Sequence, residues 1–349
     1  MNSEINLEKL FQNKSVLITG ICGTVGEEIL RQLIPYDIKK IIGLDINENE
    51  IFAISNEYKN DERIKIYYGN VRNKESLIER MRGVDIVLHT AALKHVGVCE
   101  DSPRDAVLTN INGINNLIDA AMEAKVEKVL FTSSDKAVNP TSVMGTSKLM
   151  GERLITAATG DGKERKPILA STRFGNVLGS KGSVVPIFVQ QIKKGGPVTL
   201  TNKEMTRFIM TLQEAVHLVL QSVFLAKGGE VFVTKMPVVR IEDLAIAMID
   251  LLADKYGHNS KKLPIEIIGL RPAEKMYEEL FNEEEARRTI EIDDYYVIAP
   301  ALKPVNTNAN YESGNKEALS SKIPYNSSLI SPMSVDEIKE YLVSRKIVD

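Results

Sequence analysis

The order of short apolar runs in the first half of the chain constrains its fold more than any other feature. These runs cover residues 14–20, 40–45, 64–69, 85–91, 128–132 and 167–172. They are continuous rather than alternating, and helical segments such as residues 23–33 and 103–125 separate them. Continuous apolar strands are typical of a parallel sheet that is covered on both faces. The pattern therefore predicts an α/β fold with a doubly wound parallel sheet.

Beyond Arg173 this pattern breaks up, and glycines and prolines gather at residues 175–186 and 195–197. We expect helices over residues 212–226 and 241–256, and a short strand between them over residues 230–233. Two further segments, residues 263–275 and 293–300, fit a smaller lobe that closes over the sheet. The region 302–324 has a loop-like composition. A final helix is predicted over residues 334–343, with Ser334 as N-cap and Glu337 at the third position.

Composition and charge limit the possible partners. The net charge of the 349 residues is −3, which gives no electrostatic reason to expect nucleic acid or an anionic membrane as a partner. The two cysteines, Cys22 and Cys99, have no metal-binding spacing, which favours a reducing compartment and no bound metal. The first residues lack the apolar core of a signal peptide, and no run has the length of a membrane span. We expect a cytoplasmic protein of about two domains.

A glycine-rich turn follows the first apolar run. Gly20, Gly23 and Gly26 are spaced as GxxGxxG between a predicted strand and a predicted helix. The first glycine permits a tight turn, the second a close approach of pyrophosphate to the backbone, and the third close packing of helix on strand. Thr24 and Val25 then lie at the helix N-terminus, which faces the phosphates. A tight turn alone would need fewer of these features, so the context favours a dinucleotide.

Asp45 ends the next apolar run, where a carboxylate binds the ribose hydroxyls of adenosine and repels a 2′-phosphate. The residues after it include no arginine that could neutralise such a phosphate, so NAD is favoured over NADP. Asn70 and Val71 end the third strand and would flank the adenine. Ala91 and Ala92 end the fourth and would lie beside the nicotinamide ribose. Either pair could also be only a strand terminus.

Residues 131–148 contain the groups best suited to catalysis. The predicted strand delivers Ser134, Asp135 and Lys136 to its carboxyl end, and a helix that starts after Pro140 presents Lys148. A buried carboxyl group can protonate a leaving hydroxyl, and a desolvated lysine can act as a base near neutral pH. Elimination of water beside a ketone needs such a pair, whereas a simple alcohol dehydrogenase does not. The alternative readings are a surface ion pair and a solvated helix lysine.

Several unusual strings carry a resemblance to a known family. They are AALKHV (91–96), SSDKAVNP (133–140), VMGTSK (143–148), TRFGNVLGSKGSVVPIF (172–188), MTRFIMT (205–211) and GLRPAEK (269–275). With the glycine turn, they resemble the extended short-chain dehydrogenase/reductase family, which implies a Rossmann fold. Within it the chain is most similar to the UDP-N-acetylglucosamine 4,6-dehydratases of the polysaccharide-biosynthesis group. The resemblance spans nearly the whole chain.

This resemblance implies a reaction. Hydride leaves C4 of the hexose for NAD, Lys136 removes the C5 proton, Asp135 protonates the C6 hydroxyl, and the hydride returns to C6. Lys148 would bind the nicotinamide ribose. The family's usual tyrosine is replaced by Met144, and members of the group have either residue at that place. Asp135 is the first candidate to accept the C4 hydroxyl proton, with Ser134 as a hydrogen-bonding helper.

The resemblance also implies binding residues. Asn110 would order Lys148 through water, and Lys94 would face the sugar and the cofactor. The remaining residues expected at the UDP-sugar are Arg173, Asn176, Ser183, Val184, Arg207, Arg271 and Glu274.

The same resemblance suggests how the domains are divided. Residues 1–180 and 206–235 would form the NAD-binding domain, and residues 181–205 and 236–349 the substrate-binding lobe. The helices over 103–125 and 141–158 would form a homo-oligomer. Two alternatives stay open: a UDP-hexose 4-epimerase, which needs no acid–base pair at C5 and C6, and a non-catalytic NAD-binding protein. The sequence does not decide between retention and inversion at C5.

Overall fold

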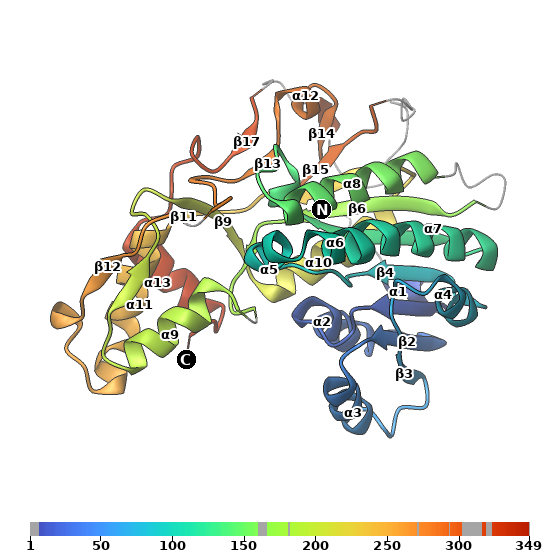
Figure 1. Ribbon diagram of the computed structural model, residues 1–349, viewed down its shortest axis with the longest axis horizontal. Coiled ribbons are helices and arrows are strands. Elements are labelled where there is room, and N and C mark those ends of the chain that lie inside the picture. Colours follow the sequence, from blue (N-terminus) through green and yellow to red (C-terminus); the bar gives the residue numbers. More distant parts are fainter. Residues whose placement is uncertain are drawn as a thin grey trace.

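A large parallel sheet forms the centre of the molecule (Figure 1). The computed structural model describes residues 7–159, 166–180, 182–270, 272–292, 294–301, 316–318 and 323–348. The parallel strands run in the order β3-β2-β1-β4-β5-β6-β10. They are β1 (Ser15–Thr19), β2 (Lys40–Asp45), β3 (Ile64–Tyr68), β4 (Ile86–His89), β5 (Lys128–Ser134), β6 (Ile168–Phe174) and β10 (Val231–Thr234). This order is that of a Rossmann fold, which confirms the predicted fold class.

Helices cover both faces of this sheet, and each face has its own buried core. The first face packs against α1 (Leu7–Phe11), α2 (Thr24–Leu33), α3 (Glu48–Glu57) and α10 (Leu212–Leu225). The second packs against α4 (Lys74–Met81), α7 (Gly113–Ala124) and α8 (Val143–Ala158). The sheet is therefore doubly wound, as its continuous apolar strands predicted.

The helix expected over residues 103–125 is divided in three. It consists of α6 (Pro103–Ala106), a π-helical turn (Val107–Asn112) and α7, and α5 (Val96–Asp101) comes before it. Turns of π-helix inside longer helices occur frequently at functional sites.

Three antiparallel strands extend the main sheet beyond β10, which corrects one expectation. They are β15 (Tyr295–Ile298), β14 (Thr289–Ile292) and β16 (Lys316–Ala318). β15 pairs with β10 in the register Thr234↔Tyr295 and Val231↔Ile298. Residues 293–300 were expected in the smaller lobe, and this was wrong for the described strand. The physical reason is that β10 would otherwise be an uncovered edge with unpaired backbone groups.

A third buried core lies outside the sheet and defines a smaller lobe. Its helices α9 (Val184–Lys193), α11 (Ile241–Leu252) and α13 (Val335–Ser344) gather on one side of Figure 1. Its strands are β7 (Asn176–Val177), β9 (Thr206–Met210), β11 (Val238–Arg240), β8 (Val198–Leu200) and β12 (Ile265–Ile267). The predicted cap of α13 is confirmed, since Ser334 and Glu337 form a reciprocal capping box.

Short elements connect the lobe to the sheet. They are β13 (Glu279–Phe281), α12 (Glu283–Ala286), β17 (Tyr325–Asn326) and the 3₁₀ turn Asp135–Ala137. Two further 3₁₀ turns, Asp254–Tyr256 and Ser260–Lys262, follow α11 within the lobe. Lys275 Nζ donates to the carbonyl of Val138 at 2.7 Å, and Thr141 Oγ1 donates to that of Ala273 at 3.1 Å. The segment before β13 is thereby held against the loop that follows β5.

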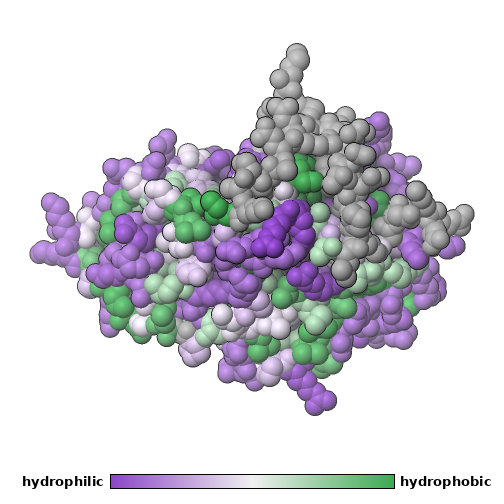
Figure 2. Space-filling view, turned by 90° about the horizontal axis from the view of Figure 1, so that it is seen from above, coloured by the Kyte–Doolittle hydropathy of each residue, from purple (hydrophilic) through white to green (hydrophobic). Residues whose placement is uncertain are grey.

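Figure 2 shows one face of the molecule, on which hydrophilic side chains are interspersed with small groups of apolar ones. Among the described residues, none of the helices combines the length and the apolar character that crossing a bilayer requires.

Candidate active site

A cavity of about 1450 Å³ opens at the carboxyl ends of β1, β2, β4, β5 and β6. This is where a doubly wound sheet binds its ligands. Twenty of the residues predicted for the site line it: Gly20, Gly23, Thr24, Val25, Gly26, Asp45, Asn70, Val71, Ala91, Ala92, Lys94, Ser134, Lys136, Met144, Lys148, Asn176, Ser183, Val184, Arg207 and Glu274. The structure thus brings together segments that lie far apart in the sequence.

The glycine turn fits a pyrophosphate. Gly20 has a φ of +74°, and a Cβ there would lie 2.7 Å from the backbone nitrogen of Ala91. A Cβ on Gly26 would lie 2.2 Å from the carbonyl oxygen of Gly20. A side chain at Gly20 would collide with the backbone that follows β4, and one at Gly26 would push helix α2 away from the glycine turn. The space and the helix N-terminus together suit a dinucleotide.

Asp45 is held in a defined position beside this turn. Its Oδ2 accepts a hydrogen bond from the backbone nitrogen of Cys22 at 3.0 Å. Its Oδ1 accepts from the nitrogens of Ile46 at 2.8 Å and Asn47 at 3.0 Å. The carboxylate is therefore oriented before any ligand arrives, which suits recognition of two ribose hydroxyls.

Asn110 has a contact that the sequence did not predict. It is buried in the π-helical turn, where its amide accepts from the nitrogen of Leu93 at 2.8 Å and donates to the Leu93 carbonyl at 2.9 Å. It also donates to Ser147 Oγ at 2.9 Å. Asn110 was expected to order Lys148 through water as part of the cofactor site, but it does not line the cavity, and its described hydrogen bonds go to Leu93 and Ser147 instead. It fixes the strand-end loop that does line the cavity.

Lys148 is buried one turn into α8. Its Nζ donates to the carbonyl of Thr132 at 2.9 Å and lies 4.8 Å from the centre of the Phe131 ring. Burial lowers the pKa of Lys148 to about 8, because an ammonium in this place loses its hydration. The nearby His89 is also buried, and burial with the charge of Lys148 lowers the pKa of His89 to about 3. His89 is thus neutral at physiological pH.

Met144 occupies an apolar environment one turn before Lys148. It is 3% exposed and packs in a cluster with Cys99 and Ala106. A thioether is a weak acceptor that neither donates nor takes a proton in this pH range. Proton chemistry at this site therefore has to come from other side chains.

Asp135 and Lys136 form the expected acid–base pair. Lys136 Nζ lies 3.1 Å from Asp135 Oδ1, and Ser134 Oγ donates to the same oxygen at 2.7 Å. Asp135 is 1% exposed and lies just behind the cavity wall, and its Oδ2 has no hydrogen-bond partner among the described residues. The pair is therefore more than a surface contact, because it lies beside the cavity and one carboxylate oxygen is unused.

Glu278 completes this cluster, and the sequence did not point to it. Its Oε1 lies 3.2 Å from Lys136 Nζ and 3.9 Å from Arg207 Nε. The carboxyl is 2% exposed, and burial raises its pKa above the usual range, although Lys136 acts in the opposite direction. No local motif marks Glu278, because its partners lie far away in the sequence. We name these residues the Lys136 cluster: Asp135, Lys136, Arg207 and Glu278.

Lys136 is charged rather than neutral in this cluster. Burial acts to lower its pKa, but the attraction of Asp135 and Glu278 outweighs burial and raises it above the ordinary lysine value. The expectation of a desolvated amine ready to act as a base near neutral pH is therefore wrong for the free protein. A base at this position first has to lose a proton.

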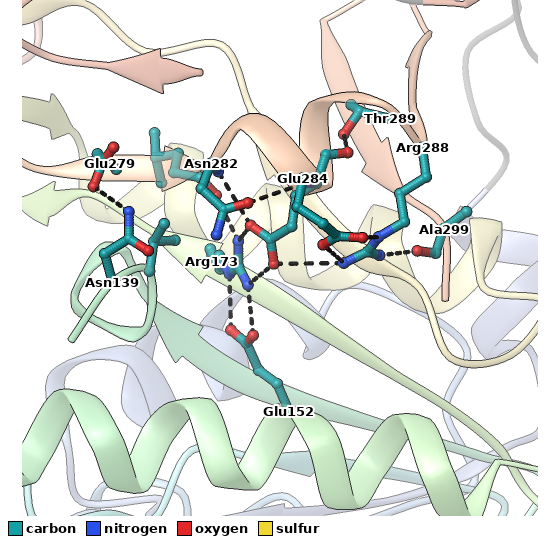
Figure 3. Close-up of polar contacts among 12 residues, drawn as sticks. Asn139, Glu152, Arg173, Glu279, Asn282, Glu284, Arg288, Thr289 and Ala299 are labelled. Carbon is teal, nitrogen blue, oxygen red and sulfur yellow. Dashed lines mark hydrogen bonds and ion pairs between the residues drawn. The ribbon is translucent and has the colours of Figure 1, made fainter. Parts of the chain in front are cut away.

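Arg173 is not a substrate-binding residue (Figure 3). It is 1% exposed and lies between two carboxylates. Its guanidinium donates to both oxygens of Glu152 at 2.9 and 2.7 Å, to both oxygens of Glu285 at 2.8 Å, and to the carbonyl of Leu280 at 2.8 Å. We name this the Arg173 cluster. Its place on β6, outside the cavity lining, overturns the sequence-based role.

The other predicted arginines have different outcomes. Arg271 lies outside the described residues. Arg207 lines the cavity, and its guanidinium donates to the carbonyls of Thr206 at 2.7 Å and Lys275 at 2.8 Å. Glu274 Oε1 lies 4.0 Å from Arg207. The forked group is thus held at the cavity wall by backbone carbonyls.

The start of α9 contributes a polar group to the cavity. Ser183 is the N-cap residue, and its buried hydroxyl has no partner within the described part of the chain. Val184 and Asn176 line the cavity beside it, and Lys94 lines it from the loop after β4. These residues thus lie at the same cavity, and their binding of a substrate stays a prediction.

The fold and the site define a dinucleotide-binding protein with a buried acid–base cluster, and comparisons with known proteins give its family. The family model described as polysaccharide biosynthesis protein matches residues 16–300. The chain belongs to this family.

Individual relatives cover nearly the whole chain. A Methanocaldococcus jannaschii protein described as an uncharacterised membrane protein is 46% identical over 337 residues, 97% of each chain. A protein of Rickettsia canadensis named UDP-glucose 4-epimerase is 38% identical over 346 residues, 97% of this chain and 98% of its own. The X-ray structure of Pen from Bacillus thuringiensis has a TM-score of 0.89 and 38% identity, and the match covers 97% of this chain and 99% of that one.

Proposed function

We propose that this protein is a UDP-N-acetylglucosamine 4,6-dehydratase that uses NAD and forms a UDP-4-keto-6-deoxy sugar. The observation that carries the proposal is the Lys136 cluster beside a large cavity in which the position one turn before Lys148 is Met144. Elimination of water requires a base that removes a proton from one carbon and an acid that protonates the hydroxyl on the adjacent carbon. The Lys136 cluster contains both an acid and a base, whereas the oxidation of an alcohol alone would not require this pair.

The cofactor would be held by the residues whose geometry fits it. Gly20, Gly23 and Gly26 leave room for the pyrophosphate, Asp45 would take the adenosine ribose, and Lys148 would take the nicotinamide ribose. When bound, NAD supplies the acceptor and later the donor of hydride.

The side chains of this chain would handle the protons. Asp135, with its unused oxygen, takes the proton of the C4 hydroxyl, and Ser134 keeps the carboxylate in position. Asp135 then gives that proton to the departing C6 hydroxyl, which leaves as water. Lys136 removes the C5 proton and later returns a proton to C5. Each proton that is taken up is also released, so the residues end in their starting state.

The UDP part would lie toward the smaller lobe. Arg207 at the cavity wall suits a diphosphate, because a guanidinium binds phosphate oxygens with a fork of donors. Asn176, Ser183 and Val184 would line the uridine side. Arg271 and Glu274 keep their predicted roles at the diphosphate and ribose. A division into two domains, with β14, β15 and β16 belonging to the sheet, is part of this proposal, as are a homo-oligomeric state and a cytoplasmic location.

A second candidate is a UDP-hexose 4-epimerase, which the name of the Rickettsia relative favours. Mass spectrometry of UDP-N-acetylglucosamine incubated with the purified protein and NAD separates the two. We expect a product that has lost one water. An unchanged mass with conversion to the galacto isomer would establish the epimerase instead, and NAD binding without turnover would favour a non-catalytic protein.

A further inference from the structure

The buried carboxyl of Glu278 has no task in the reaction described above. It reaches the Lys136 cluster from the segment just before β13, more than a hundred residues from Lys136. Its Oε1 faces Lys136 Nζ at 3.2 Å, and its Oε2 is buried with no hydrogen-bond partner among the described residues. A buried polar atom without a partner is costly, so such an oxygen is suited to take up a proton.

Lys136 needs a proton acceptor before it can act. An ammonium has three donors and no lone pair, so it cannot remove a proton from carbon. Its neighbours with acceptor oxygens are Asp135 at 3.1 Å and Glu278 at 3.2 Å. In the proposed reaction Asp135 has already accepted the proton of the C4 hydroxyl, so it cannot also accept one from Lys136. Glu278 is the other carboxylate at hydrogen-bond distance.

We propose that Glu278 takes one proton from Lys136 and so turns the lysine into the base of the reaction. The N–H bond of Lys136 breaks as the O–H bond of Glu278 forms. The free amine then takes the C5 proton and later gives one of its exchangeable protons to C5, after which Glu278 gives its proton back to the amine. No net proton is gained or lost. Glu278 acts through Lys136 and is a positioning residue, and this inference rests on the proposed dehydratase function.

The charges around Lys136 support transfer within the cluster. Asp135 faces it from the 3₁₀ turn after β5, Glu278 from the segment before β13, and Arg207 from β9. Glu274 lies 4.0 Å from Arg207. The four residues of the cluster comprise two cations and two carboxylates, and moving a proton between Lys136 and Glu278 leaves the total charge unchanged. Burial raises the pKa of Glu278, which makes its carboxylate a better acceptor.

The pH profile of dehydration by Glu278→Gln tests the proposal, with Glu279→Gln as the matched control. Glu279 is the next residue, and its carboxylate binds Asn139 at 2.9 Å outside the cluster. We expect Glu278→Gln to lose about 100-fold in rate at pH 7, because Lys136 is still protonated at this pH and then has no Glu278 carboxylate to take its proton. The rate should recover as the pH rises toward the midpoint of Lys136, since the lysine then enters the reaction already neutral. Glu279→Gln keeps the wild-type profile, and Glu278→Asp, which retains a carboxyl, restores part of the rate. An equal loss at every pH, or no loss, would overturn the proposal.

A second readout needs no turnover. Trace acetylation of lysines by acetic anhydride across a pH series, followed by mass spectrometry of the peptide with Lys136, reports when this amine loses its proton. We expect the midpoint to move to lower pH in Glu278→Gln, because one attracting carboxylate is gone. An unchanged midpoint would contradict the coupling. If the midpoint moves but the wild type releases no water from UDP-N-acetylglucosamine, the dehydratase function fails while the proton coupling stands.

Discussion

Two buried ionic clusters of this molecule, the Arg173 cluster and the Lys136 cluster, differ in how completely their hydrogen bonds are used. In the Arg173 cluster all five donors of the guanidinium are bonded, and both oxygens of Glu152 and of Glu285 accept. In the Lys136 cluster Asp135 Oδ2 and Glu278 Oε2 have no partner among the described residues. Both clusters join the sheet domain to the segment 272–286.

The difference separates a structural role from a chemical one. The Arg173 cluster has no free donor or acceptor that could bind a substrate, and it lies outside the cavity lining. A partly bonded cluster keeps acceptor oxygens that cost stability in the free protein and can bind or take protons from a ligand. We therefore expect substitutions in the Lys136 cluster to change the reaction and substitutions in the Arg173 cluster to change the fold.

The largest effect is expected for Asp135→Asn. The amide keeps the size of the side chain but cannot carry the proton from the C4 hydroxyl to the C6 hydroxyl. We expect the dehydration rate to fall by about 10²–10⁴-fold, the range for loss of a general acid or base. Rate assays under saturating substrate, with denaturant unfolding in parallel, check this. Full activity of Asp135→Asn would contradict the assignment of Asp135 as the acid that protonates the C6 hydroxyl.

Arg173→Met is expected to act mainly on stability. It leaves the carboxylates of Glu152 and Glu285 buried without their partner, and we expect a loss of about 3–5 kcal/mol in the free energy of unfolding. The matched control replaces Glu152 and Glu285 by Met as well, which should recover most of the loss. Denaturant titration measures both. If Arg173→Met unfolds like the wild type, the distinction between the clusters is wrong.

The pH dependence of stability tests the burial of Lys148. Its pKa is lowered to about 8 in the folded protein, below the 10.5 of an ordinary lysine. Between these values the unfolded chain binds more protons than the folded one, so stability rises with pH. We expect the free energy of unfolding to rise by about 3 kcal/mol from pH 8 to 10.5, relative to Lys148→Met. If the free energies of unfolding of the wild type and of Lys148→Met change with pH in parallel, the lowered pKa of Lys148 is contradicted.

The smallest effect is expected for Asp45→Asn, which should weaken the binding of NAD. The carboxylate of Asp45 is held by three backbone nitrogens and still faces the cavity, so it combines features of both clusters. Asp45→Asn removes hydrogen bonds to a charged group, worth about 1.5–3 kcal/mol, so the Kd for NAD should rise about 10- to 100-fold. Isothermal titration with NAD and NADP measures this. Tighter binding of NADP than NAD by the wild type would sink the assignment.

The sequence predicted the parts of this molecule that depend on local pattern. The continuous apolar runs gave the parallel strands because burial on both faces leaves no place for polar alternation. The glycine turn and Asp45 were predictable because backbone geometry and a strand end fix them. The edge strand β15 was misplaced, because its segment shows no sign of which sheet edge it will cover.

The rest of the site depends on contacts between distant residues. Arg173 lies in a string typical of the family's substrate side, but its partners Glu152 and Glu285 come from α8 and α12 and take every donor. Glu278 has no motif that marks it, and the neighbours that define its chemistry are Lys136 and Arg207. Charge state follows such neighbours, so the protonated state of Lys136 could not be inferred from its own segment.

The most direct test of the central claim is proton NMR of UDP-N-acetylglucosamine turnover by the NAD-supplied protein in deuterated water. Elimination by the Lys136 cluster removes the C5 proton and replaces it with one from exchangeable groups. The hydride that NAD transfers from C4 to C6 does not exchange with solvent. We predict a 6-deoxy product with deuterium at C5 and none at C6. A galacto product that keeps its C5 proton and its C6 hydroxyl would contradict the account.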